Sequence, residues 1–239
     1  MTKKEVAKMI DHTLLAAYAT TKEIKQLCKE AKKNGFASVC INPSYIPLAS
    51  ELLKDTDVKD CTVIGFPLGA DTTESKAFAA SDAVAKGADE IDMVINVGEA
   101  KNGHFDYVEA DIKAVVDAVR KAAKKRKISA IVKVILETCY LTDSEVVKAC
   151  NASKNAGADF VKTSTGFGTP KALDGSSLPN GASVHHVKLM KKTVGDKLKV
   201  KAAGGIRSVR TALDLIEAGA DRLGTSSGIL IMQKWDTEC

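Results

Sequence analysis

The sequence predicts a single-domain α/β fold over residues 1–239, the (β/α)8 or TIM barrel, with a short N-terminal helix. Nearly continuous apolar runs alternate with helical patterns, as expected of parallel strands that are covered on both faces. The length fits, because such barrels use about 250 residues for one domain. A doubly wound open sheet is the alternative, but no GxGxxG motif follows an early strand.

A recurring phrase at helix ends supports this alternation. Glycine adopts the left-handed conformation that ends many helices, and each copy of the phrase precedes an apolar run. The four copies are Asn34-Gly35, Lys86-Gly87, Ala156-Gly157 and Ala218-Gly219.

The pattern gives eight strands and eight main helices. We expect strands near residues 10–13, 38–42, 60–66, 89–95, 128–136, 159–163, 198–202 and 221–224. We expect helices near 21–33, 44–54, 73–86, 105–125, 142–155, 183–193, 208–217 and 226–233. Thr20 or Thr21, Thr142 and Ser208 are suited to cap helix starts. The polar stretch 169–181 is longer than a minimal connection, and both a functional lid and a disordered excursion fit it.

The composition is that of an ordinary globular protein. With 35 basic and 30 acidic residues the net charge is +5, which permits anionic ligands. The densest basic run, 121–127, ends a helical pattern without interleaved aromatic residues, so we expect no nucleic-acid partner. Six cysteines without CxxC pairs indicate reduced thiols, and no segment has the apolar length of a signal peptide or a membrane span. We therefore expect a cytoplasmic protein with no membrane partner.

Three lysines in consecutive predicted strands are the main chemical signal. Lys133, Lys162 and Lys201 each interrupt an apolar run. A single such lysine could equally point outward or pair with a carboxylate, but three would share one barrel interior. Like charges in a desolvated site disfavour one another, so we expect at least one amine to titrate below its free value of about 10.4. A neutral amine there could attack a carbonyl and form a Schiff base.

Asp92 is the candidate proton carrier. Strand alternation places Glu90, Asp92 and Val94 on one side. A carboxylate that faces the lysines could pass protons through water, or it could form a structural ion pair with Lys133 or Lys201. Both interpretations can hold together.

Two glycine turns predict a phosphate site. Residues 204–208 follow the seventh strand and 224–228 follow the eighth, and each turn leads into a helix. Exposed N–H groups at such turns bind phosphate, and these two loops form the usual phosphate site of barrels.

Metal and cysteine chemistry have little support, and we expect no metal and no cofactor. The histidines have no HxH or HExxH spacing, and His185 and His186 should diverge because successive helical residues point about 100° apart. Cys40 could act as a nucleophile, but no histidine is obviously placed as its base. We therefore interpret Cys40 as a small residue that closes the site.

These motifs together resemble the deoxyribose-phosphate aldolases, over essentially the whole chain. The matching segments are Asp11-His12-Thr13-Leu14-Leu15, Val39-Cys40-Ile41-Asn42-Pro43, Gly65-Phe66-Pro67-Leu68-Gly69, Glu90-Ile91-Asp92-Met93-Val94, Val161-Lys162-Thr163-Ser164-Thr165-Gly166 and Lys201-Ala202-Ala203-Gly204-Gly205-Ile206-Arg207. The last two are highly specific in combination.

The resemblance implies a metal-independent class I aldolase. Such an enzyme reversibly cleaves 2-deoxy-D-ribose 5-phosphate to acetaldehyde and D-glyceraldehyde 3-phosphate. It commonly forms homo-oligomers, usually dimers, so we expect a homodimer or a higher homo-oligomer. Lys162 would be the Schiff-base nucleophile, Lys201 the cation that lowers its pKa, and Asp92 the proton relay. The implied substrate-binding residues are Asp11, Thr13, Cys40, Lys133 and Thr165. The implied phosphate-binding residues are Gly166, Gly204, Gly205, Arg207, Ser226 and Ser227.

The chain departs from the family pattern in three places. Some members have a lysine where this chain has Phe167, so Arg207 or Lys171 would meet part of the phosphate charge. The 169–181 connection is longer than usual, and the tail 234–239 lacks the C-terminal tyrosine of some members. Two alternatives stay open: another Schiff-base sugar-phosphate aldolase, and a phosphosugar-binding barrel without catalysis.

Overall fold

The chain folds into a closed barrel of eight parallel strands. The structure, a computed structural model, describes residues 1–238. The strands pair in sequence order and β8 returns to pair with β1. They are β1 (Ile10–Leu14), β2 (Ser38–Ile41), β3 (Lys59–Ile64), β4 (Glu90–Val94), β5 (Ile131–Ile135), β6 (Phe160–Lys162), β7 (Lys199–Ala203) and β8 (Arg222–Thr225). The predicted barrel is confirmed.

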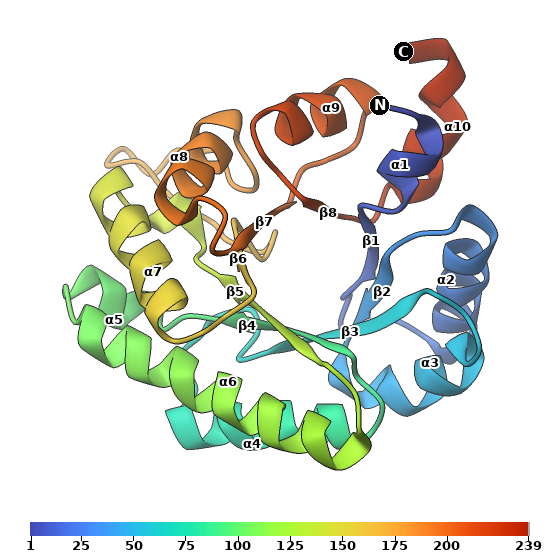
Figure 1. Cartoon of the computed structure of the whole chain (residues 1–239). Helices are drawn as coiled ribbons and strands as arrows, with labels where there is room; N and C mark the ends of the chain where they lie inside the picture. The colour runs from blue at the N-terminus through green and yellow to red at the C-terminus, as the bar shows by residue number, and fades with distance from the viewer. Residues whose placement is uncertain (239) are drawn as a thin grey trace.

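Helices surround the barrel, as Figure 1 shows. They are α1 (Lys3–Ala7), α2 (Thr21–Asn34), α3 (Ile46–Leu53), α4 (Thr73–Ala85), α5 (Val97–Lys101), α6 (Phe105–Arg126), α7 (Asp143–Asn155), α8 (Val184–Val194), α9 (Val209–Glu217) and α10 (Gly228–Glu238), with short 3-10 turns at Pro43–Tyr45 and Thr138–Tyr140. Lys3 Nζ lies 2.9 Å from a carboxylate oxygen of Asp236, so the two ends of the chain meet. Within residues 1–238, no helix is both long and apolar enough to cross a bilayer.

The local signals act as the sequence predicts. Thr20 and Thr142 form capping boxes with the glutamates three residues on, and Ser208 accepts the Thr211 N–H to cap α9. The glycines of the four recurring phrases all have positive φ, from 65° at Gly35 to 132° at Gly87. A side chain would be strained there, which explains the glycine.

The boundaries differ where main-chain hydrogen bonds compete with strand pairing. The predicted strand 128–136 contains only β5, because the N–H of Ile128 donates to Ala123 and closes α6. The predicted strand 60–66 ends before Gly65, whose φ of 63° turns the chain. The five-residue α5, capped by the Asn96 side chain, was not predicted, because one and a half turns give no clear periodicity.

Apolar and charged residues divide between the two sides of the sheet. The apolar core fills the space between strands and helices, with contributions such as Ile91, Val132, Val161 and Leu223. Strand alternation then turns charged residues of the same strands toward the barrel axis. The interior of this barrel is therefore ionic where most barrels are aliphatic.

Candidate active site

Three buried lysines meet inside the barrel. Lys133, Lys162 and Lys201 lie on the adjacent strands β5, β6 and β7, and Lys162 is directly paired in register with Lys201. All three ammonium nitrogens lie within hydrogen-bond distance of one carboxylate, that of Asp92 on β4. The predicted convergence of these strand lysines is confirmed.

Asp92 is the centre of this cluster. Its Oδ2 accepts from Lys162 at 2.7 Å and from Lys201 at 2.6 Å, and its Oδ1 accepts from Lys133 at 2.8 Å. The side chain is completely buried. Burial alone would raise the pKa of Asp92, but the charges of the three lysines hold that pKa well below its usual range. Asp92 is therefore an anion that links the three amines.

Further carboxylates lie beneath the lysines. Asp11 Oδ2 lies 2.5 Å from Lys201 Nζ, and Glu90 Oε2 lies 2.5 Å from Lys133 Nζ. The Asp11 contact is an ion pair, because it is close but poorly aligned for a hydrogen bond. Burial disfavours the charge on Asp11, yet the cations of Arg222, Lys201 and Lys133 lower its pKa.

These carboxylates correct one expectation from the sequence. Burial acts to lower the pKa of Lys133 and of Lys201, as predicted, but the neighbouring carboxylates outweigh it and raise both pKa values. Lys133 acts to lower the pKa of Lys201, as predicted, but the net shift of both lysines is upward, so neither is an amine with a lowered pKa. The prediction counted cations along the strands and left out the carboxylates that strand alternation brings to the same interior.

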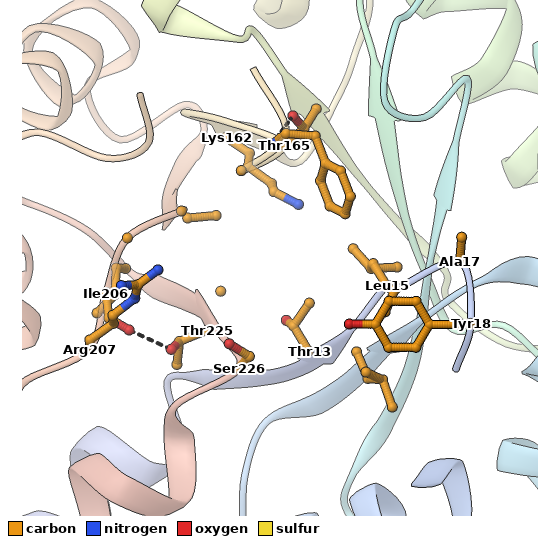
Figure 2. A pocket seen from close by; sticks show the side chains of 18 residues that line it. Thr13, Leu15, Ala17, Tyr18, Lys162, Thr165, Ile206, Arg207, Thr225 and Ser226 are labelled. Atoms are coloured by element: carbon orange, nitrogen blue, oxygen red, sulfur yellow. Dashed lines mark hydrogen bonds between the residues drawn. The ribbon is translucent and has the colours of Figure 1, made fainter. Parts of the chain in front are cut away.

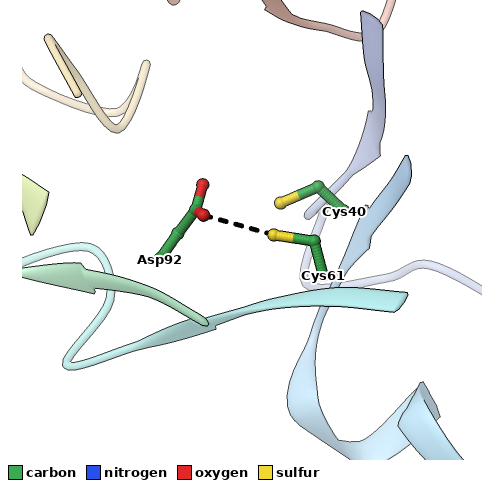
Figure 3. Close-up of side chains that lie close together, drawn as sticks. All are labelled: Cys40, Cys61 and Asp92. Atoms are coloured by element: carbon green, nitrogen blue, oxygen red, sulfur yellow. Dashed lines mark hydrogen bonds between the residues drawn. The ribbon is translucent and has the colours of Figure 1, made fainter. Parts of the chain in front are cut away.

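Two cysteine thiols also face Asp92, as Figure 3 shows. Cys61 Sγ lies 3.2 Å from Asp92 Oδ1 and 3.3 Å from Lys133 Nζ, and Cys40 lies beside it on β2. The three ligand-type atoms lie within 4.8 Å of one another. A metal cation would compete there with three ammonium groups that already occupy the Asp92 oxygens, so this group is poorly suited to metal binding.

A cavity of about 600 Å³ opens above the lysine cluster. Figure 2 shows the Lys162 amine directed into the cavity, with Arg207 and Ser226 on one side and Leu15 and Tyr18 on the other. Lys162 is 3% exposed, while Asp92 and Lys201 are fully buried beneath it. The amine of Lys162 is therefore the one of these three that a molecule in the cavity could contact.

Three glycines from two turns line one end of this cavity. Gly166, Gly204 and Gly205 have φ values of 85°, 90° and 77°. A Cβ atom on Gly204 would lie 2.8 Å from the Cα of Gly181 and 3.4 Å from that of Gly166, so the main chains pack closely there. Among residues 1–238, no acceptor pairs with the N–H groups of Gly166, Gly205 or Ser226. Free N–H groups beside the Arg207 guanidinium suit an anion such as phosphate.

Thr165 lines the cavity, but its hydroxyl is already engaged. It donates to the buried carboxylate of Glu137 and accepts from the N–H of Phe167 at 3.0 Å. The N–H of Thr165 also donates to Glu137, at 3.2 Å. Burial raises the pKa of Glu137, which has a left-handed backbone at φ 56°. Glu137 therefore fixes the turn that follows Lys162.

An apolar wall faces the glycine turns, and the sequence did not single it out. Leu14, Leu15 and the 16–18 segment line the cavity after β1. The ring of Phe167 meets that of Phe66 edge-on, with centroids 5.2 Å apart. Position 167 thus joins the turns after β3 and β6 through an aromatic contact. The position of Phe66 at the end of a predicted strand was the signal that could have indicated this contact.

Some predicted binding residues do not reach the cavity. Thr13, Thr165, Gly166, Gly204, Gly205, Arg207 and Ser226 line it. Asp11, Cys40 and Lys133 do not, because their side chains lie deeper among the charged groups, and Ser227 donates its N–H to Thr225 Oγ1. Lys171 also does not line it, since its ammonium group donates to Ser177. Of the two cations predicted to meet the phosphate charge in place of a lysine at 167, the structure brings Arg207 to the cavity.

The long connection after β6 supports the glycine turns. Lys171 and Ser177 form an isolated antiparallel bridge, and the N–H of Ala182 donates to the carbonyl of Gly204 at 3.1 Å. The end of the 169–181 stretch therefore packs against the turn after β7.

The adjacent histidines depart from expectation. His185 Nε2 lies 2.9 Å from both carboxylate oxygens of Asp143, and a ring nitrogen of His186 lies within 4.8 Å of these atoms. The prediction that the two rings diverge was wrong, because rotation about the side-chain bonds offsets the 100° between their Cα atoms. The group lies outside the cavity, on the N-terminal turns of α7 and α8.

Known proteins resemble this chain over its whole length. The model of the DeoC/LacD family aldolases matches residues 5–234. A deoxyribose-phosphate aldolase from Caldanaerobacter subterraneus subsp. tengcongensis is 56% identical over 98% of this chain and 97% of its own length. One from Carboxydothermus hydrogenoformans is 58% identical over 96% and 94%. A tetrameric deoxyribose phosphate aldolase from Aeropyrum pernix superposes with a TM-score of 0.87 at 31% identity, over 100% of this chain and 94% of the other. The chain therefore belongs to the DeoC/LacD family of aldolases.

Proposed function

We propose that this chain is a deoxyribose-phosphate aldolase that acts through a Schiff base on Lys162. It reversibly cleaves 2-deoxy-D-ribose 5-phosphate to acetaldehyde and D-glyceraldehyde 3-phosphate. The main support is one arrangement: the Lys162 amine, 2.7 Å from Asp92, points into a cavity whose other side has the glycine turns and Arg207. A five-carbon sugar phosphate requires both an amine for its aldehyde carbon and a cradle for its phosphate.

The proposed cycle uses one nucleophile and one relay. Neutral Lys162 attacks C1 of the open-chain sugar, and Asp92 passes protons while the carbinolamine loses water to form the iminium ion. The C2–C3 bond then breaks, its electron pair moves into the enamine, and the C3 hydroxyl loses its proton to become the aldehyde of glyceraldehyde 3-phosphate. Protonation of the enamine at C2 and hydrolysis release acetaldehyde and restore the amine.

Borohydride trapping tests this proposal most directly. In the presence of 2-deoxy-D-ribose 5-phosphate, borohydride should reduce the iminium ion and leave a stable adduct on Lys162, visible by peptide mass spectrometry. Lys162→Met is the matched control and should give no adduct. An adduct on another lysine, or none in the wild-type protein, would reject the mechanism.

Substrate choice separates this function from its alternatives. A panel of phosphorylated aldehydes with acetaldehyde would identify another Schiff-base sugar-phosphate aldolase. Binding without acetaldehyde release would support a non-catalytic phosphosugar-binding barrel. A class II aldolase would lose activity with a chelator, whereas we expect no effect of the chelator on this chain.

The glycine turns provide a matched pair of variants. Gly204→Ala should raise KM for the phosphorylated substrate about tenfold or more, because its Cβ would lie 2.8 Å from the main chain of Gly181. Gly205→Ala should have a smaller effect: it too has positive φ, but nothing lies within 4 Å of its Cβ. Steady-state kinetics measure both. Equal effects would show that the close packing at Gly204 does not shape the phosphate site.

We further propose that residues 1–239 form one domain and that the enzyme works in the cytoplasm as a homo-oligomer. The contact between Lys3 and Asp236 supports a single unit, and the free thiols of Cys28, Cys40, Cys61, Cys139 and Cys150 suit a reducing compartment. The tetrameric relative from Aeropyrum pernix supports oligomerisation. A solution mass of one chain by light scattering would contradict it.

A further inference from the structure

A salt-bridged layer closes the barrel below the lysine cluster. Arg222 begins β8, and its side chain is directed inward with 13% exposure. Its guanidinium donates to Asp11 on the neighbouring β1, with Nε at 2.8 Å. It also reaches across the barrel to Glu90 on β4, with Nη2 at 3.0 Å. Neither Arg222 nor Glu90 lines the cavity, so neither can touch the proposed substrate.

Alternating charges connect this layer to the nucleophile. From Arg222 one path runs through Asp11 to Lys201, and a second runs through Glu90 to Lys133. Both lysines then donate to Asp92, which also accepts from Lys162. Arg222 and Glu90 thus lie at one end of this series of ion pairs, and the amine of Lys162 lies at the other end.

Every strand contributes a titratable group to this interior. They are Asp11 on β1, Cys40 on β2, Cys61 on β3, Glu90 and Asp92 on β4, Lys133 on β5, Lys162 on β6, Lys201 on β7 and Arg222 on β8. The interior therefore holds four basic and three acidic side chains. Glu137 also faces Lys162 from the end of β5, where Thr165 holds its carboxylate.

We propose that Arg222 and Glu90 are positioning residues that together set the pH at which Lys162 loses its proton. A fixed cation disfavours the ammonium form of a nearby amine, and a fixed carboxylate favours it. Such effects extend over several ångströms in an interior from which water is excluded. The inference rests on the proposed function, since it assigns these residues a role in preparing the Schiff-base amine.

The test is the pH dependence of kcat/KM, which reports groups of the free enzyme. Arg222→Gln removes a cation, so the acid limb of the profile should move to higher pH, by about one unit. Glu90→Gln removes an anion, so the limb should move to lower pH by a similar amount. Arg222→Lys keeps the charge and should restore the wild-type limb, and the double variant R222Q/E90Q should lie between the two single variants. The substrate phosphate titrates alike in all of them.

A purely structural role would give a different result. Loss of packing would lower kcat/KM at every pH without moving the acid limb of the profile. Acid limbs at the same pH in all folded variants would overturn the proposal. Circular dichroism identifies the folded variants. If Arg222→Gln does not fold, the shift of the acid limb to lower pH in Glu90→Gln still tests the proposal. Borohydride trapping on the wild-type protein comes first. An adduct on Lys162 with unmoved limbs rejects only this inference, whereas the absence of an adduct rejects the proposed function itself.

Discussion

Replacing Lys201 with leucine should lower turnover at neutral pH by about 10³-fold. Lys201 donates to Asp92 Oδ2 at 2.6 Å, and the same oxygen accepts from Lys162 at 2.7 Å. Without Lys201, that oxygen accepts a hydrogen bond from Lys162 alone and stabilises the ammonium form of Lys162 more strongly. A smaller fraction of the enzyme then has the neutral amine. Activity should recover in part as the pH is raised. Steady-state kinetics between neutral and alkaline pH measure both effects.

Two variants make this result specific. Lys201→Arg keeps a cation at the position and should retain more activity than Lys201→Leu. Lys199→Leu changes the exposed lysine at the start of the same strand and should leave turnover nearly unchanged. Near-normal activity of Lys201→Leu at neutral pH would contradict the electrostatic role of Lys201.

Replacing Asp92 with asparagine should damage both catalysis and stability. The side chain accepts from three buried lysines, and asparagine offers one neutral oxygen in place of two charged ones. We expect turnover to fall by about 10² to 10⁴-fold, the usual contribution of a general acid or base. The free energy of unfolding should fall by about 3 to 5 kcal/mol, because buried cations lose their partner. Kinetics and urea denaturation measure the two losses separately.

The pH dependence of stability provides a further check on Asp92. Its pKa in the folded protein lies below the value near 3.9 of an unfolded aspartate. The charged form therefore stabilises the fold above about pH 4, and this contribution is lost as the pH falls further. The stability difference between wild type and Asp92→Asn should narrow under acidic conditions. Asp82→Asn, in an exposed pair with Lys86 on α4, should change stability by less than about 1 kcal/mol. A difference that does not change with pH would contradict the ionised state of Asp92.

Local sequence signals predicted the frame of this molecule well. Apolar runs such as those around Val161 and Val200 indicated strands covered on both sides, and the glycines at helix ends marked the connections. Because side chains alternate along a strand, the sequence predicts that Lys133, Lys162 and Lys201 share one interior. The same alternation placed Glu90 on the same side of the strand as Asp92, although the ion-pair partner of Glu90 was not predicted.

The ion-pair partner of each charged side chain was harder to predict. Arg222 and Glu90 are separated by 132 residues in the chain and meet because β8 and β4 face each other across the barrel. Nothing in the local sequence of either strand indicates the other. The family resemblance implied that Asp11, Cys40 and Lys133 contact substrate, whereas depth along the barrel axis puts them below the cavity.

Local sequence is enough to predict the eightfold alternation, the lysine-bearing strands and the glycine turns, because each depends on propensities within a few residues. Which charges neutralise one another and which amine reaches the cavity depend instead on the three-dimensional arrangement of the strands. Closure of the barrel brings seven charged side chains into one desolvated space, and there their energies depend on distances across the barrel. Of the lysines in residues 1–238, Lys162 alone lines the cavity. This result depends on the depth and direction of each side chain, which no strand specifies locally.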